Sequence, residues 1–214
     1  MSIPALDGPS GWTELDGEGK RERLLGAAAD VFSREGLDAS MPAIAAAAGA
    51  GVASVYRQYP SKHELLAALV MRRLDQIAEA AAEAAARAGD RWSALTEMLW
   101  ALVERQSDDF LGEARVAVAD HPGVAEAAER ASAALECLLA GARAEGRLRA
   151  DASTLDLKLL FAATRAAKQV EPAAWQRMLS LLIDALDNER DPARRVGARA
   201  VDIAPVGPVR RAGP

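Results

Sequence analysis

Aromatic residues make up only 4 % of this 214-residue chain, and it has no runs of β-branched residues. These are the residue types that favour β-strands, so a sheet protein is not expected. Alanine recurs along most of the chain instead, and half of all residues are hydrophobic. Because alanine is the strongest helix former, the composition predicts an all-α protein with enough apolar surface for a real core.

Cysteine and histidine are also scarce, with one Cys and two His in the whole chain. A single thiol cannot form an internal disulfide, and Cys137 lies in a leucine-rich stretch, so we expect it to be a small core residue. His63 and His121 lie far apart, and we expect no metal site from them. The sequence lacks a phosphate-cradling glycine motif, a nucleophile elbow and a Cys-His motif, so we expect neither an enzyme nor a cofactor.

Long hydrophobic runs are missing as well. Residues 1–19 contain no Lys or Arg and no continuous apolar stretch, which is unlike a secretory signal. The alanine-rich residues 78–88 carry Glu79, Glu83 and Arg87 at four-residue spacing, which indicates a solvated helical face and not a membrane span. We therefore expect no membrane association and a cytoplasmic location.

The net charge of −5 hides an asymmetry along the chain. Residues 20–73 contain eight Lys and Arg against five Asp and Glu, whereas the remainder contains 18 against 26. A small basic N-terminal part next to an acidic body is the distribution that suits a protein whose one end contacts DNA phosphates.

Hydrophobic residues at helical spacing divide the N-terminal part into short helices. The first carries the apolar positions of residues 24–32 and ends at Gly36. Ser40 is a suitable N-cap for the second, which ends at Gly49. A glycine-bearing turn then leads into a third helix over residues 52–58. Two short helices around a tight turn predict a helix-turn-helix.

A long helix follows, because Ser61 and Glu64 form a capping box, and it extends to Ala88 before the joint at Gly89-Asp90. Further apolar stripes predict helices over residues 92–103, 110–119, 124–145, 155–170 and 173–186. The expected units are a disordered N-terminus (1–18), a three-helix helix-turn-helix DNA-binding domain (19–66), a larger C-terminal helical ligand-binding and dimerisation domain (67–190) and a disordered tail (191–214).

Residues 40–62, SMPAIAAAAGAGVASVYRQYPSK, resemble the DNA-binding signature of the TetR family of bacterial regulators. They share an Ile-Ala pair, an Ala-Gly turn, a recognition helix with small residues and a tyrosine, an aromatic before Pro, and a Ser-Lys start to the next helix. The chain departs from the pattern at Ala50 and Gly51, where the family often has Val and a polar residue, and at Gln58, where it often has His or an aromatic. Because of these departures, the resemblance does not predict which operator sequence the protein binds.

A recognition helix must enter the major groove, so its first turn has to be slim, as Gly51, Val52, Ala53 and Ser54 allow. The two apolar members of this turn suit contacts such as that with a thymine methyl group. Arg57 is the only long donor on this helix. It either takes guanine O6 and N7 in a bidentate contact or neutralises a phosphate, and both readings remain open.

The resemblance implies that Tyr56 and Lys62 hold backbone phosphates, with Ser40, Ser54 and Gln58 as helpers. Standing alone, Tyr56 would be read as a core aromatic and Lys62 as a solvated surface charge. Val55 and Tyr59 should pack inward against the preceding helices.

The resemblance also implies a ligand cavity among the middle helices and a dimer interface on the last two. Seven bulky or polar residues are candidates for the cavity wall, each of which is otherwise a core or loop residue: Trp100, Phe110, Arg115, His121, Phe161, Arg165 and Trp175.

The expected protein is a homodimer that binds near-palindromic double-stranded operator DNA and a small-molecule effector of unknown identity, most simply a repressor that the effector releases. An activator, or a helical small-molecule-binding protein of the same fold that does not bind DNA, are the alternatives.

Overall fold

The computed structural model describes residues 12–87, 89–104 and 110–189. Within these ranges the chain forms nine α-helices, one short 3-10 helix and no strand, which confirms the predicted fold class. In chain order the elements are η1 (Trp12–Glu14), α1 (Gly17–Glu35), α2 (Met41–Ala48), α3 (Val52–Gln58), α4 (Lys62–Ala86), α5 (Arg91–Glu104), α6 (Leu111–Ala117), α7 (Pro122–Ala144), α8 (Thr154–Val170) and α9 (Ala174–Leu186).

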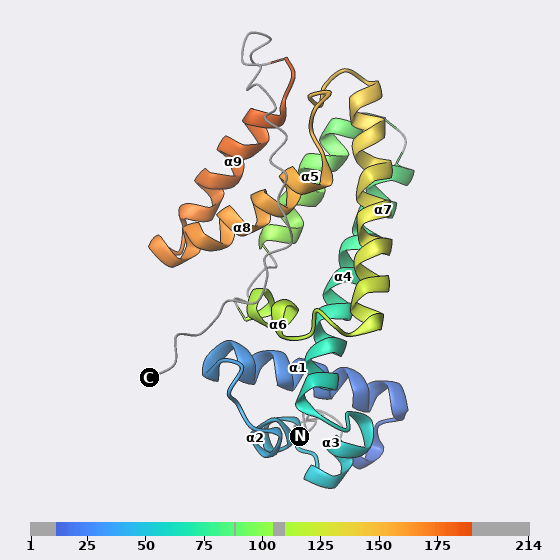
Figure 1. Cartoon of the computed structure of the whole chain (residues 1–214), viewed down its shortest axis with the longest axis vertical. Coiled ribbons are helices and arrows are strands. Elements are labelled where there is room, and N and C mark those ends of the chain that lie inside the picture. The colour runs from blue at the N-terminus through green and yellow to red at the C-terminus, as the bar shows by residue number, and fades with distance from the viewer. Residues whose placement is uncertain (1–11, 88, 105–109, 190–214) are drawn as a thin grey trace, which may run out of the picture.

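Helices α1, α2 and α3 form a head at one end of the molecule (Figure 1). The predicted stops at Gly36 and Gly49 are confirmed, since both residues have positive φ angles, of 75° and 65°, which glycine adopts without a Cβ clash. The Ser40 hydroxyl accepts a hydrogen bond from the Ala43 amide at 3.3 Å, as its predicted capping role requires.

The N-terminal boundary differs from the prediction. Of the segment expected to be disordered, residues 12–16 carry η1 and the Asp16 cap, and α1 already begins at Gly17. The cause is local: Asp16 accepts a hydrogen bond from the Gly19 amide at 2.7 Å, and Trp12 packs against the head. Residues 1–11 and the predicted tail after residue 190 lie outside the described residues.

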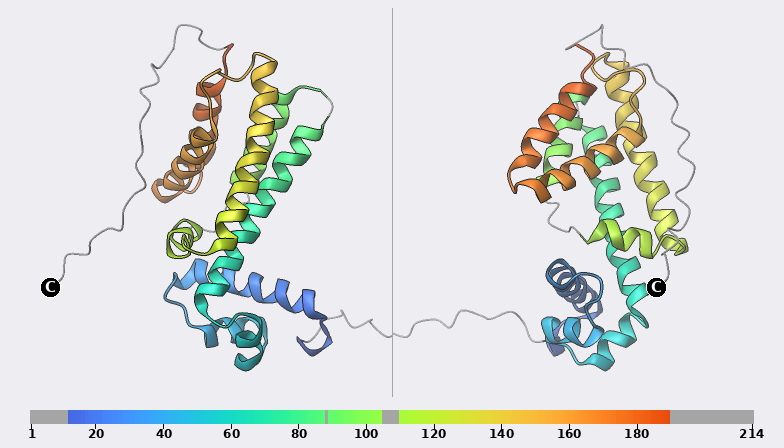
Figure 2. Two further views of the ribbon diagram at one scale, coloured as in Figure 1. Left: turned by 45° about the vertical axis from the view of Figure 1, so that its right-hand side comes forward. Right: turned by 60° about the vertical axis from the view of Figure 1, so that its left-hand side comes forward.

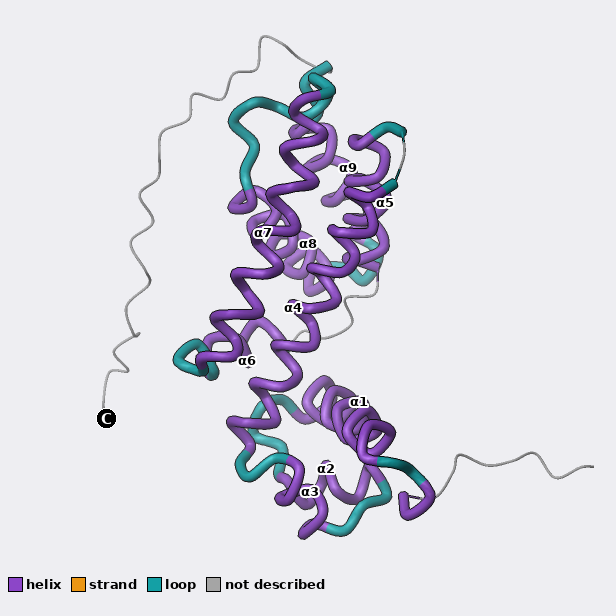
Figure 3. Tube along the Cα trace, turned by 90° about the vertical axis from the view of Figure 1, so that its right-hand side faces the viewer, coloured by secondary structure: helices purple, strands orange, loops and turns teal. Residues whose placement is uncertain are grey.

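Helix α4 runs from the head into the body of the molecule, where α7 lies along it (Figures 2 and 3). Ser61 caps its start by accepting from the Glu64 amide at 3.1 Å, which is half of the predicted capping box. The Glu64 carboxylate turns instead to His121, whose Nε2 lies 3.5 Å from Oε2. The start of α4 is thereby tied to the residue that precedes α7.

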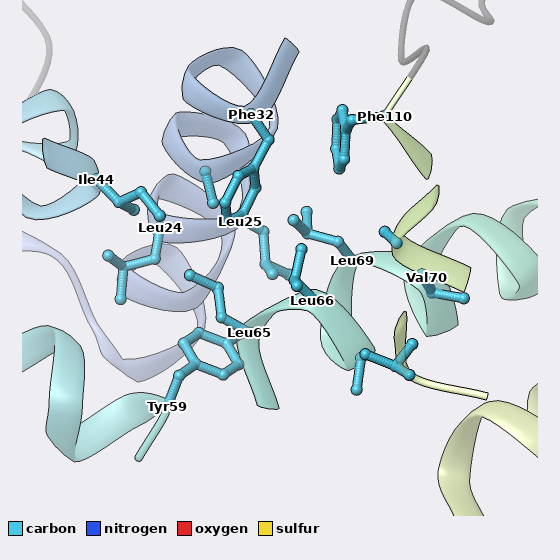
Figure 4. Close-up of a cluster of buried hydrophobic side chains, with 14 of the residues drawn as sticks. Leu24, Leu25, Phe32, Ile44, Tyr59, Leu65, Leu66, Leu69, Val70 and Phe110 are labelled. Carbon is cyan, nitrogen blue, oxygen red and sulfur yellow. The ribbon is translucent and has the colours of Figure 1, made fainter. Parts of the chain in front are cut away.

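Two hydrophobic cores share α4. The first core combines the head with residues 65–74 of α4, with Phe110 and α6, and with the first turns of α7. Figure 4 shows its centre, where Phe32, Leu24 and Ile44 converge with leucines of α4. The second core joins the rest of α4 to α5, the rest of α7, α8 and α9. The two cores do not separate at residue 66, where the sequence predicts the end of the first domain, because residue 66 and its neighbours on α4 belong to the first core.

Helices α8 and α9 lie side by side on one flank of the body (Figure 1). Each buries one face in the second core, through residues such as Leu160 and Leu179. Leu155 and Leu159 of α8 and Leu181 of α9 nevertheless remain 42 %, 54 % and 47 % exposed. This flank therefore carries apolar surface that the other described residues leave uncovered.

Candidate functional site

Helix α3 has one buried and one open face. Val55 is fully buried and Tyr59 is 5 % exposed, so both pack inward as expected. Val52, Ala53, Tyr56 and Arg57 face solvent, with the Tyr56 side chain 44 % exposed. Because α3 follows directly on Gly51 and begins with small residues, its first turn presents a slim, accessible ridge at the end of the head.

Arg57 is held along this ridge by a neighbour on the same helix. Its Nη2 donates to the Ser54 Oγ at 2.8 Å, and the bond is exposed to solvent. Such a contact orients the guanidinium at little cost, and its remaining N–H groups point to no acceptor in the described residues. The arrangement leaves both readings of Arg57, base contact and phosphate contact, as predictions.

Lys62 is placed differently from a simple surface charge. Its Nζ donates to the carbonyl oxygen of Leu37 at 2.7 Å and lies 3.5 Å from that of Ala39. The ammonium thereby fixes the turn between α1 and α2 to the start of α4. It has three N–H donors, so one remains for a phosphate, and a phosphate contact stays a prediction.

The helper residues fall on two sides of the head. Ser40 is exposed at the start of α2, where its hydroxyl hydrogen remains available for an acceptor. Gln58 is half-buried and lines a groove between α1 and α4, next to Tyr59, Arg21 and Arg72. It therefore points toward this groove and less toward the open face of α3 than Tyr56 and Arg57, which are exposed.

Tyr59 lines the same groove, and its burial there indicates a structural role. Burial raises the pKa of its hydroxyl above the ordinary value of 10.0, although Arg21 and Arg72 favour the ionised form. Arg72 is in turn paired with Glu22, at 3.3 Å between Nη1 and Oε2. The aromatic before Pro60 thus anchors the end of α3 in the first core.

A cavity of about 350 Å³ lies in the body between α4, α6, α7 and α8. Three of the seven predicted lining residues reach it, namely Arg115 from α6 and Phe161 and Arg165 from α8. Its apolar wall comes from residues such as Leu74 and Leu157. Because an apolar wall and a few polar groups converge on one space, this cavity is the candidate effector site.

The other four predicted lining residues lie elsewhere. Phe110 packs in the first core, with its ring centroid 5.6 Å from that of Phe32. Trp100 and Trp175 pack edge to face against each other at 5.7 Å, at the margin of the second core. His121 occupies the N-cap position of α7 and faces Glu64. Helical spacing alone could not separate these core and cap positions from a cavity wall.

Sequence reasoning missed several residues of the cavity, notably Arg73, Gly112 and Lys158. A usable signal was present on α8, where residues 158, 161 and 165 follow each other at spacings of three and four and so share one face. Arg73 is held there by the carbonyl oxygen of Leu102, to which its Nη2 donates at 2.9 Å.

Cys137 is exposed, so the expectation that it is a core residue was wrong. It lies on α7 between Leu135 and Leu138, which turn toward the second core and leave residue 137 on the outer face. Among the described residues, no cluster of three or more His, Cys, Asp and Glu is arranged to hold a metal ion. No helix in the described ranges has the length and apolar character needed to cross a membrane.

Comparison with known proteins points to one family. A sequence model of bacterial regulatory proteins of the tetR family matches residues 24–69, which include most of α1, all of α2 and α3, and the start of α4. A search among curated proteins found no match.

Several solved structures are similar over most of the chain. A TetR transcription regulatory protein from Mycobacterium vanbaalenii is 30 % identical, over 78 % of this chain and 94 % of that one, with a TM-score of 0.57. A TetR transcriptional regulator from Streptomyces coelicolor is 26 % identical, over 78 % and 98 % of the two chains, with a TM-score of 0.61. SmeT, the repressor of a multidrug efflux pump of Stenotrophomonas maltophilia, is 24 % identical, over 82 % and 92 %, with a TM-score of 0.57, a likeness of fold alone.

Proposed function

Because this chain belongs to the TetR family of bacterial regulatory proteins, we propose that it is a homodimeric repressor that binds near-palindromic operator DNA and is released by a small-molecule effector. The observation that carries the proposal is the open face of α3, whose small first turn stands free at the tip of the head while Val55 and Tyr59 anchor the helix from behind. A helix presented in this way fits the major groove.

Binding would combine phosphate contacts with sparse base reading. Tyr56, Lys62 and the hydroxyls of Ser40 and Ser54 are the phosphate-binding candidates, and these contacts set the position of the head on the duplex. Arg57 is the one long side chain on α3 that reaches either a guanine edge or a phosphate. With so few hydrogen-bonding groups on α3, the shape of the DNA should carry much of the specificity.

A second copy of the chain would cover the exposed leucines of α8 and α9. Two such helix pairs form a four-helix bundle when they meet about a two-fold axis, which buries Leu155, Leu159 and Leu181. The same axis places two α3 helices so that they enter successive major grooves, roughly 34 to 36 Å apart.

The effector would act from the cavity through α4 and α6. Helix α4 contributes residues to the cavity wall and also to the first core, and α6 follows directly on Phe110, which contacts Phe32 in the head. An effector that prefers one position of these helices tilts α4 and changes the separation of the two heads. Release requires this preference, since a ligand shifts an equilibrium only by its differential affinity.

The test of DNA binding is fluorescence anisotropy with duplex DNA from upstream of the gene, compared with a shuffled duplex of equal length. We expect the upstream DNA to bind more tightly and its affinity to fall steeply between about 50 and 200 mM salt. Ala53→Asp, on the open face of α3, should lower the affinity at least about tenfold, because the new carboxylate meets phosphates.

Ala133→Asp is the matched control, since Ala133 is an exposed alanine of α7 far from the head. Its DNA affinity should equal that of the unchanged protein. Equal affinity of the Ala53→Asp variant would refute the assignment of α3, and a protein that binds no DNA would be the helical ligand-binding alternative. Sedimentation of Leu159→Asp should give a monomer where the unchanged chain gives a dimer.

A further inference from the structure

The charged residues that line the cavity in the body all have the same sign. Four of its lining residues are cations, Arg73 on α4, Arg115 on α6, and Lys158 and Arg165 on α8, and none of the described residues that line it is Asp or Glu. Outside residues 20–73 the chain carries 26 acidic against 18 basic residues. Three of the four cations, Arg115, Lys158 and Arg165, come from this acidic part of the chain, so the single sign of charge in the cavity is a local feature and not a consequence of composition.

Three of these cations have no carboxylate partner in the described part of the chain, namely Arg115, Lys158 and Arg165. Arg115 and Lys158 are exposed, whereas Arg165 is half-buried, so its partly desolvated guanidinium gains the most from an anionic partner. The side chains thus supply hydrogen-bond donors and positive charge to the cavity, and the described residues offer them no acceptor of opposite charge.

Gly112 makes room for the Arg165 head group. A Cβ atom at residue 112 would lie 2.7 Å from the Arg165 Cζ and closer still to one of its nitrogens. The guanidinium therefore rests directly against the backbone of α6, one turn before Arg115. Two arginines from two different helices are in this way brought to the same end of the cavity wall.

Apart from Gly112 and Ser132, the remainder of the lining is apolar. Leu74 and Ile77 of α4, Leu135 of α7, and Leu157 and Phe161 of α8 face the same space. Its volume of about 350 Å³ is near the lower end of the range of ligand cavities. A ligand that satisfies both parts of the wall is small, with an apolar body and one anionic group.

We infer that the cavity binds an amphipathic organic anion, with its apolar body against α4 and α7 and its oxyanion between Arg115 of α6 and Arg165 of α8. This inference rests on the proposed function, since it gives the chemical class of the effector. Guanidinium groups match the two oxygens of a carboxylate in a bidentate arrangement, and Lys158 adds a third charge at the rim. The anion also offsets the repulsion between two like charges on neighbouring helices, so it favours an arrangement in which α6 and α8 approach each other.

The experiment is isothermal titration calorimetry of the full chain with three probes that share one hydrocarbon tail: decanoate, decanol and decyltrimethylammonium. We expect decanoate to bind at least about tenfold more tightly than decanol, because charge-assisted hydrogen bonds are added to the same apolar contact, and the cation to bind weakest. The Arg115→Gln, Arg165→Gln double variant should lose most of the preference for decanoate over decanol, because only Lys158 and Arg73 remain as cations of the wall.

Arg130→Gln is the matched control, because Arg130 lies on α7 outside the cavity and pairs with Asp75. It should keep the preference for decanoate. Gly112→Ala tests the geometry with all charges retained: it displaces the Arg165 head group and should weaken decanoate binding while decanol binding stays the same. Thermal melts of each variant separate these effects from unfolding.

Equal binding of the three probes, stronger binding of the cation, or binding of none of them would overturn the inference. The DNA assay is independent of this result. A protein that binds upstream DNA but shows no preference for decanoate is a regulator with another class of effector. A protein that prefers decanoate but binds no DNA keeps the anion site and refutes the proposed regulator.

Discussion

Replacing Lys62 by Met would separate two roles that this side chain combines. The variant keeps the aliphatic stem of a half-buried residue and removes only the ammonium, which donates to Leu37 at 2.7 Å. A hydrogen bond from a charged donor contributes roughly 1.5 to 3 kcal/mol, and partial solvent access lowers the contribution of this one to the bottom of that range or just below it, about 1 to 2 kcal/mol. For a chain of this size that loss lowers the Tm by roughly 2 to 8 °C.

The same variant reports on phosphate binding through the salt dependence of DNA affinity. One phosphate contact fewer in each protomer reduces the slope of log K against log salt by about 1.8 for a dimer. Anisotropy titrations at several salt concentrations measure the slope, and differential scanning calorimetry measures the Tm.

Each role has its own refuting result. An unchanged Tm would show that the bond to the α1–α2 turn contributes nothing to stability. An unchanged salt slope, with the Tm lowered as expected, would show that Lys62 is a structural residue and not a phosphate ligand.

Two further predictions concern the joint between head and body and the start of α5. Phe110→Ala removes a ring that is 5 % exposed, and it should lower the free energy of unfolding, measured by chemical denaturation, by about 3 to 5 kcal/mol. Val116→Ala, at a 79 % exposed site on α6, is the control and should lower it by less than about 0.5 kcal/mol. Similar losses in the two variants would contradict the assignment of Phe110 to the core. The Asp90 carboxylate accepts from the amides of Trp92 and Ser93, and the Ser93 hydroxyl and amide hold its pKa below 3.8. Its contribution to stability is therefore complete at neutral pH and is lost as the pH falls through that lowered pKa, so Asp90→Asn should lose less stability on acidification, and an identical pH profile would argue against the cap.

Helix boundaries were predictable from the sequence because they depend on residues within four positions of each other. Ser40 and Ser61 cap the next turn, and Gly49 adopts the left-handed angle that ends α2. The third helix was predicted over its observed residues, 52–58. The start of α1 was missed because it depends on Asp16 and on packing of Trp12 against the head.

The cavity was only partly predictable because its walls come from four helices that are distant in sequence. Arg165 meets the backbone of Gly112 from α8, and nothing near either residue in the sequence indicates the other. Phe110 and Arg115 are neighbours along the chain, yet one enters the first core and the other the cavity. Resemblance to a family supplies the general location of such a site but not the side chains that line it.

Helix α4 belongs to both cores, and its length sets the scale of any motion passed along it. A helix of 25 residues is about 37 Å long. A rotation of about 5° around its far end displaces its first residue by roughly 3 Å, which is close to one base-pair step along a duplex. A shift of roughly 1 to 2 Å where α4 passes the cavity is thus about doubled at the head and becomes a mismatch of register on DNA, without either core having to come apart.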